Sequence, residues 1–241
     1  MTGTDPVLVE RIVPPRLGPS FRRTVIPRMQ LPRTMFDAKP KFCVECLRER
    51  AILPAAWDLT VWIACPVHGC LLSDRCPTCD EPATWQRTCI DQCGINGCQG
   101  RFSHNSTQPA DARLVALSHL VAARIGMRGD VRNSLFESSF AELADEDLLL
   151  LVGRLGQVAA CGMRSDEASD GPAMMAAKLL CDWPKALRDF ARSEAAGENF
   201  SAHSTSAFPR IKFLISRNTR ISIVSEAVRE FVTRAFLEAI P

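Results

Sequence analysis

The 241-residue sequence contains no tyrosine, and aromatic residues make up only 7% of it. Proteins that bind single-stranded nucleic acid by stacking its bases need several aromatic rings, so this composition disfavours that mode of binding. The chain also lacks the run of about eighteen uncharged apolar residues that a membrane span requires. Its stretch "DLLLLVGRLGQVAACG" is interrupted by Arg154. We therefore expect no contact with a membrane.

A secretory signal peptide is not visible either. The first residues, "MTGTDPVLVERIV", carry acids at Asp5 and Glu10 and have no basic start followed by an apolar run. We therefore expect a cytoplasmic protein, whose thiols are kept reduced. The cysteine count of eleven is odd, so a scheme made only of disulfides would leave one unpaired. Clustered cysteines in this setting indicate a metal or redox site.

Recognisable enzyme motifs are missing as well. The sequence has no P-loop, no nucleophile elbow and no H-E-x-x-H string, and it lacks the H-x-E with P-C-x-x-C pair of zinc deaminases. No carboxylate follows His68 at the offset that a catalytic base would need, because Gly69 and Cys70 stand there. These absences disfavour a hydrolytic metalloenzyme, and we expect a protein that is not an enzyme.

The sequence is rich in closely spaced cysteines between residues 42 and 100. Cys43 and Cys46 form a C-x-x-C pair, and Cys65 and His68 form C-x-x-H. A spacing of two residues lets a tight turn direct two side chains at one cation, and zinc prefers four nitrogen or sulfur ligands in a tetrahedron. These four residues predict a complete zinc site. A thioredoxin-like redox pair is the alternative, but it requires a βαβ context that is not seen around Cys43.

A second zinc site is predicted from the cysteines that follow. Cys76 and Cys79 form another C-x-x-C pair, and two further ligands come from the next segment. We assign Cys93 and Cys98, with Cys89 as the substitute. The sequence thus predicts two zinc ions. Each would have four protein ligands, which is typical of structural zinc, whereas catalytic zinc keeps one position for water.

The same segment resembles the TniQ/TnsD family. The resemblance covers residues 42 to about 102, with a weaker echo at "AAKLLCDWPKALRDFA", and it rests on these positions: Cys43, Cys46, Leu47, Trp57, Asp58, Leu59, Cys65, Pro66, His68, Gly69, Leu72, Arg75, Cys76, Pro77, Cys79, Trp85 and Arg87. Members select target sites for heteromeric transposons. The resemblance implies double-stranded DNA and an AAA+ ATPase transposition regulator as partners, and in some members a CRISPR effector complex. A zinc-stabilised DNA-binding transcriptional regulator, unrelated to transposition, is the alternative.

The region before Cys43 differs from the family pattern, in which a longer helical segment is usual. Residues 1–41 hold eight Lys or Arg against three acids, with seven prolines. Prolines fix φ and disfavour regular structure, so this composition predicts an extended basic arm. A basic arm can add DNA affinity that does not depend on sequence. The alternative is a linker packed over the zinc region.

The remainder of the chain, residues 104–241, predicts amphipathic helices. "STQPADARLVALSHLVAARIG" has Leu114, Leu117, Val121 and Ile125 on one stripe, and Pro109 suits a first turn. Ser139 and Glu142 have capping-box spacing, and Asp145 offers a second start. Two helices should meet at Asp182, before Pro184. The tail carries an apolar stripe at helical spacing: Val224, Val228, Phe231, Val232 and Phe236.

A basic stretch before the last predicted helix is the best candidate DNA contact outside the arm. "FPRIKFLISRNTRIS" contains Arg210, Lys212, Arg217 and Arg220, and a turn at "RNT" between helical pieces would suit a helix-turn-helix element. The expected fold is therefore mainly α, with a small tandem zinc-finger module of ribbon or knuckle type over residues 42–103 and a helix-turn-helix-like C-terminal part.

Overall fold

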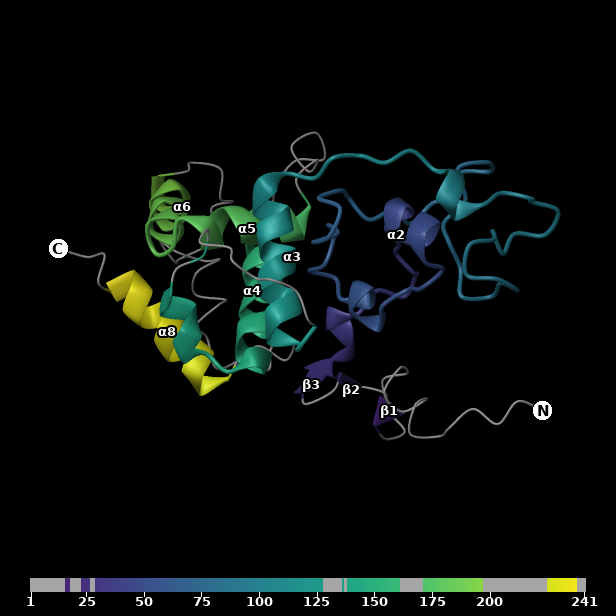
Figure 1. Ribbon diagram of the computed structural model, residues 1–241. Coiled ribbons are helices and arrows are strands. Elements are labelled where there is room, and N and C mark those ends of the chain that lie inside the picture. Colours follow the sequence, from purple (N-terminus) through teal and green to yellow (C-terminus); the bar gives the residue numbers. More distant parts are fainter. Residues whose placement is uncertain are drawn as a thin grey trace, which may run out of the picture. The chain divides into compact units, whose positions relative to one another are not determined.

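The structure is a computed structural model, and it describes residues 16–17, 23–26, 29–127, 136, 138–160, 171–196 and 225–237. The chain divides into two compact units, Met1–Val131 and Arg132–Pro241, which are described separately. Figure 1 shows the helices and strands of each. The division of the sequence at residues 41 and 103 stays a prediction.

The first unit begins with three short antiparallel strands in the order β1-β2-β3. They are β1 (Arg16–Leu17), β2 (Arg23–Ile26) and β3 (Met29–Pro32). In these strands the expected arm is extended, but it also forms a regular ladder, which the proline content had argued against. Pro32 is tolerated because it lies at the end of β3, an edge strand where a missing N–H costs little.

The segment after β3 pairs with the Trp57-Asp58-Leu59 segment. Phe36 forms a bridge with Leu59, and the Thr60 N–H donates to the Met35 carbonyl at 2.9 Å. The largely buried Lys41 supports this pairing, because its Nζ donates to the Leu59 carbonyl at 2.8 Å and forms an ion pair with Asp37 at 2.6 Å. Trp57 and Leu59 are buried, so the alternation in this segment places its two apolar side chains in the core.

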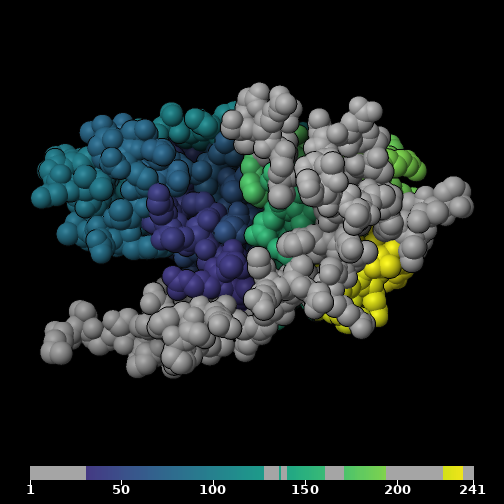
Figure 2. Space-filling model, turned by 180° about the vertical axis from the view of Figure 1, so that it is seen from behind, coloured from purple at the N-terminus to yellow at the C-terminus, as the bar shows by residue number. Residues whose placement is uncertain are grey.

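Regular structure is scarce in the rest of this module. It consists of α2 (Val44–Glu49), η2 (Ala55–Asp58) and η3 (Phe102–His104), with η1 (Arg33–Met35) following β3. Isolated bridges, such as Phe42 with Ser73 and Ala64 with Leu71, join the loops. The core includes Phe42 and Phe102, which are fully buried with ring centroids 4.6 Å apart. Figure 2 colours the described part of this unit from purple to teal.

The first unit ends with α3 (Ala112–Arg124). Its N-cap is Asp111, whose carboxylate accepts the Arg113 N–H at 2.8 Å. We had expected Pro109 to lie in the first turn of this helix. It instead precedes the N-cap and forms a bridge with Cys70. Leu114, Leu117 and Val121 are buried, as the predicted stripe requires.

The second unit is helical over its described residues. After η4 (Ser138–Glu142) come α4 (Asp145–Ala160), α5 (Pro172–Cys181), α6 (Lys185–Ala196) and α8 (Glu226–Leu237). The two expected starts near Ser139 and Asp145 thus become a short 3₁₀ helix and the start of α4. The break between α5 and α6 falls at residues 182–184, as predicted from Pro184, and the Trp183–Pro184 peptide bond is cis.

Three aromatic rings join the elements of this unit. The centroid of the Phe140 ring lies 5.6 Å from that of Trp183 and 5.7 Å from that of Phe231. The rings of Trp183 and Phe231 are stacked, with their centroids 5.3 Å apart. The rings come from η4, the α5–α6 break and α8, so residues about ninety positions apart meet in one cluster. Val228 and Val232 of the predicted C-terminal stripe are buried beside them on α8.

The expected fold class, mainly α with a small zinc-type module, is confirmed. The predicted helix-turn-helix element lies outside the described residues. In the part of the chain that the structure covers, none of the helices has the length and apolar character to cross a membrane.

The contact between α4 and α5 generates a stability prediction. A Cβ atom on Gly156 would lie 2.2 Å from the Pro172 carbonyl oxygen. At an open helix position, Gly→Ala stabilises by about 1 kcal/mol, but crowding a packed contact typically costs about 1–3 kcal/mol. We expect Gly156→Ala to lower the free energy of unfolding, measured by chemical denaturation. The control is Gly171→Ala, where the new Cβ meets nothing within 4 Å. An increase in stability for Gly156→Ala would contradict the described packing.

Candidate metal centres

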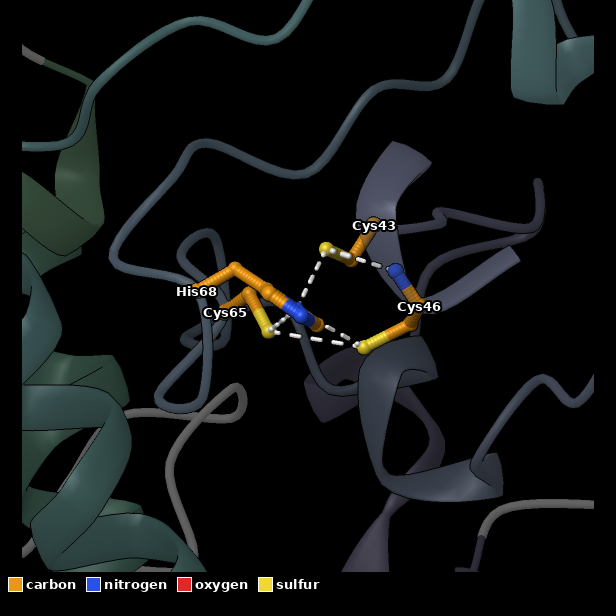
Figure 3. Close-up of side chains that lie close together, drawn as sticks. All are labelled: Cys43, Cys46, Cys65 and His68. Carbon is orange, nitrogen blue, oxygen red and sulfur yellow. Dashed lines mark hydrogen bonds between the residues drawn. The ribbon is translucent and has the colours of Figure 1, made fainter. Parts of the chain in front are cut away.

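The first candidate centre is formed by Cys43, Cys46, Cys65 and His68, which the structure brings together. Cys43 is the N-cap of α2, and its Sγ accepts the Cys46 N–H at 3.4 Å. Cys65 and His68 lie on a tight turn, closed by a hydrogen bond from the Gly69 N–H to the Cys65 carbonyl at 2.9 Å. Figure 3 shows the four side chains converging from these two segments.

The imidazole of His68 faces the three sulfur atoms with its Nδ1. That nitrogen lies 3.5 Å from Cys43 Sγ, 3.3 Å from Cys46 Sγ and 3.6 Å from Cys65 Sγ. Its other nitrogen, Nε2, lies 3.0 Å from the Glu49 carboxylate. The side chain of His68 is only 16% exposed, whereas that of Glu49 is 57% exposed. The ring therefore has one nitrogen directed at the sulfur atoms and the other at a carboxylate near the surface.

The second candidate centre is formed by Cys76, Cys79, Cys93 and Cys98. Backbone N–H groups point at three of these sulfur atoms: Thr78 at Cys76 (3.4 Å), Ile95 at Cys93 (3.5 Å) and Gly100 at Cys98 (3.3 Å). Gly100 leaves room for the cluster, because a Cβ atom there would lie 2.5 Å from Cys76 Sγ. This close approach requires glycine at position 100.

Donor spacing in both groups fits one tetrahedral zinc ion. A Zn–S length of about 2.3 Å places two ligand sulfur atoms about 3.8 Å apart, and a sulfur and a nitrogen about 3.5 Å apart. The sulfur pair Cys46–Cys65 is separated by 3.7 Å, and the pairs Cys76–Cys98 and Cys79–Cys93 by 3.8 Å. The Nδ1 distances of His68 also match. The eight predicted residues thus fit a metal ion in each group, and their role as ligands stays a prediction.

Thiols packed this closely resist ionisation. Burial, with Cys65 as a neighbour, raises the pKa of Cys46 to about 12, and burial raises the pKa of Cys93 to about 12. Burial also opposes ionisation of Cys76, but backbone N–H groups of Cys79 and Thr78 outweigh it and lower its pKa to about 7. A divalent cation supplies the charge that several adjacent thiolates need. Metal binding should therefore release protons from these groups.

Cys89 and Cys70 lie outside both groups of four. The sulfur atoms of Cys76 and Cys79 are grouped with those of Cys93 and Cys98 and not with that of Cys89, so the structure offers Cys93 and Cys98 rather than the substitute. Cys70 is buried, with its Sγ 3.4 Å from Cys43 Sγ. Sequence reasoning gave Cys70 no role, because four residues already completed the first set. Its only indication in the sequence was a fourth cysteine beside the Cys43, Cys46, Cys65 and His68 set.

Arg87 is a further residue near the second centre that sequence reasoning did not place. Its guanidinium lies 5.2 Å from the centroid of the Phe102 ring and 5.7 Å from that of Trp85. Burial lowers the pKa of Arg87, and Cys93 opposes this effect. The cation thus lies close to two aromatic rings and near enough to Cys93 to be attracted by that thiol when it is ionised.

The predicted DNA-contacting residues, Arg210, Lys212, Arg217 and Arg220, lie outside the described residues, and so does Cys161. Cys181 is half-buried on α5. The DNA contact of this basic stretch thus stays a prediction from the sequence.

Comparison with known families bears on the first centre. The TniQ family model matches residues 14–72, which include Cys43, Cys46, Cys65 and His68. This match begins earlier than the resemblance seen in the sequence, so most of the basic arm belongs to it. A search of the curated proteins finds no match. A TniQ domain implies a role associated with transposition. Residues 14–72 are therefore a TniQ domain.

Proposed function

We propose that this chain is a non-enzymatic, zinc-binding adaptor for transposition target-site selection. It binds double-stranded DNA, a targeting complex, or both, and it recruits the AAA+ ATPase regulator of the transposon. In some systems a CRISPR effector complex would be the targeting partner. One observation carries the zinc-platform part of the proposal: both groups can close a metal site with four protein ligands, and the first group lies within the residues that match the TniQ family.

Closed sites favour a structural role for the metal. Zinc that acts on a substrate keeps an open coordination position, whereas four cysteine or histidine ligands leave none. The module also has little regular structure to hold it together, with α2 only six residues long. Because metal binding and folding are coupled in such modules, zinc would supply the stability that the small core lacks.

The TniQ match alone supports recruitment of an ATPase. DNA binding is supported by this match and also by the distribution of charge along the chain. Residues 205–241 carry six Lys or Arg against three Glu, whereas residues 131–170 carry three Arg against eight acids. Opposite charge on two segments suits two different partners. The basic segment would contact phosphates.

The metal content of the purified protein tests the platform. We expect elemental analysis to give two zinc ions per chain, because both groups have the spacing of a tetrahedral site. Cys93→Ser should lose one ion, since it removes a ligand of the second group. Cys89→Ser is the matched control and should keep both, because Cys89 is exposed and outside that group. Loss of zinc from the Cys89 variant, or a parent protein with one ion or none, would contradict the assignment.

Salt dependence tests the DNA contact. Each phosphate contact steepens the slope of log K against log[salt] by about 0.9 for B-DNA. Replacing Arg217 and Arg220 with Gln should weaken binding and make the slope shallower by about 1.8 if each contacts one phosphate. Fluorescence anisotropy with a labelled duplex at several salt concentrations measures this. Arg192→Gln, on α6, is a control for the loss of one exposed positive charge. A slope that stays the same would show that the two arginines do not contact phosphates.

Binding to the AAA+ regulator separates the adaptor from a transcriptional regulator. We expect the immobilised, zinc-loaded chain to bind the purified AAA+ ATPase of its own transposon in the presence of a non-hydrolysable ATP analogue, as followed by biolayer interferometry. Cys43→Ser should abolish binding by unfolding the module, and Cys181→Ser should retain it. DNA binding without any binding to the ATPase would favour the zinc-stabilised transcriptional regulator instead.

A further inference from the structure

The first candidate centre contains an acid that lies outside its group of four. Glu49 Oε1 is 3.0 Å from His68 Nε2, while the opposite ring nitrogen, Nδ1, faces the sulfur atoms of Cys43, Cys46 and Cys65. A neutral imidazole carries its proton on one nitrogen only, and a metal can bind only the other. The position of that proton therefore decides which nitrogen is available as a ligand.

We propose that Glu49 is a positioning residue for the first metal centre. Its carboxylate accepts a hydrogen bond from Nε2–H of His68, keeps the proton on that nitrogen, and so presents unprotonated Nδ1 to the metal. Carboxylates that hold metal-binding histidines in this way also raise the basicity of the ligand. The inference rests on the proposed zinc binding and adds a residue on which the affinity of this centre depends.

The geometry of α2 explains why this residue can act there. Cys46 and Glu49 are three positions apart, so they lie on the same face of the helix. One short helix thus supplies two thiols, from its N-cap and first turn, and an acid from its last residue. The turn that carries Cys65 and His68 docks against that face, and the imidazole bridges the thiols and the acid.

An ordinary surface ion pair is the competing interpretation. The Glu49 side chain is 57% exposed, and an exposed pair of this kind contributes little to folding. Such a pair would leave metal affinity unchanged when it is removed. A positioning role requires a loss of affinity at one centre only, because the second group has four cysteines and contains no histidine.

Competition with a chromophoric zinc chelator on the full-length chain tests the inference. Glu49→Ala should weaken the binding of one of the two zinc ions by about 10- to 100-fold, which is the usual effect of removing such a partner. Glu49→Gln should recover most of the affinity, because its amide oxygen can still accept the Nε2–H bond. The second zinc ion in the same molecule is an internal reference for folding and protein concentration.

Glu45→Ala is the control on the same helix. Glu45 carries the same charge, but its carboxylate accepts bonds from Arg48 and Thr107 instead of His68. This variant should leave both zinc affinities unchanged. Equal losses in the Glu45 and Glu49 variants, or an equal loss in Glu49→Gln and Glu49→Ala, would show that charge rather than orientation matters and would overturn the inference.

The outcome for the parent protein separates this inference from the proposed function. Two tightly bound zinc ions in the parent, with parental affinity in Glu49→Ala, would overturn the positioning role and leave the zinc platform standing. A parent that binds fewer than two zinc ions would overturn the platform itself, and with it the role of Glu49.

Discussion

Convergence of four donor atoms from two short turns is the constraint on which the first unit depends. The loops between these turns have no helix or ladder to fix them apart from α2, η2 and isolated bridges. Their backbone is held by hydrogen bonds between segments, such as Phe42 with Ser73, and by N–H groups that point at cysteine sulfur atoms. Contacts of the second kind are strongest when the sulfur is an ionised, metal-bound thiolate. In the proposed zinc-loaded protein, the metal, the thiolates and the turns would therefore stabilise one another.

The described part of the second unit contains no comparable group of cysteine and histidine residues. Its helices bury apolar stripes against one another. The centroids of the Phe140, Trp183 and Phe231 rings lie within 5.7 Å of one another. Close packing sets the requirements here, as at Gly156, where the Pro172 carbonyl leaves no space for a side chain. In the proposed zinc-loaded protein, the first unit would thus add metal coordination to its small apolar core, whereas the described helices of the second unit rely on apolar burial.

Local patterns in the sequence predicted much of this arrangement. The two-residue spacing of Cys43 with Cys46, and of Cys65 with His68, was enough to group the first four donors, because a tight turn has few ways to direct two side chains. Pro184 predicted the α5–α6 break for a similar local reason. The local ladder of β1–β3 was missed because the prolines of this segment argued against regular pairing. Contacts between segments far apart in the sequence were not predictable: the docking of Pro109 on Cys70 and the contact of Glu49 with His68. Their partners are set by the three-dimensional fold, and no spacing rule connects them.

A metal whose four positions are filled by protein has no open position for a partner, so under the proposed function the first unit would bind its partners through exposed protein groups. Val67 lies within the first ligand turn and is 75% exposed, and Trp85 lies between the ligand pairs of the second centre and is 53% exposed. A loop that is anchored at both ends by coordinated residues would lose little conformational freedom when it binds, and this would lower the entropic cost of association. In the proposed adaptor, metal coordination would thus support partner binding even though the metal contacts no partner.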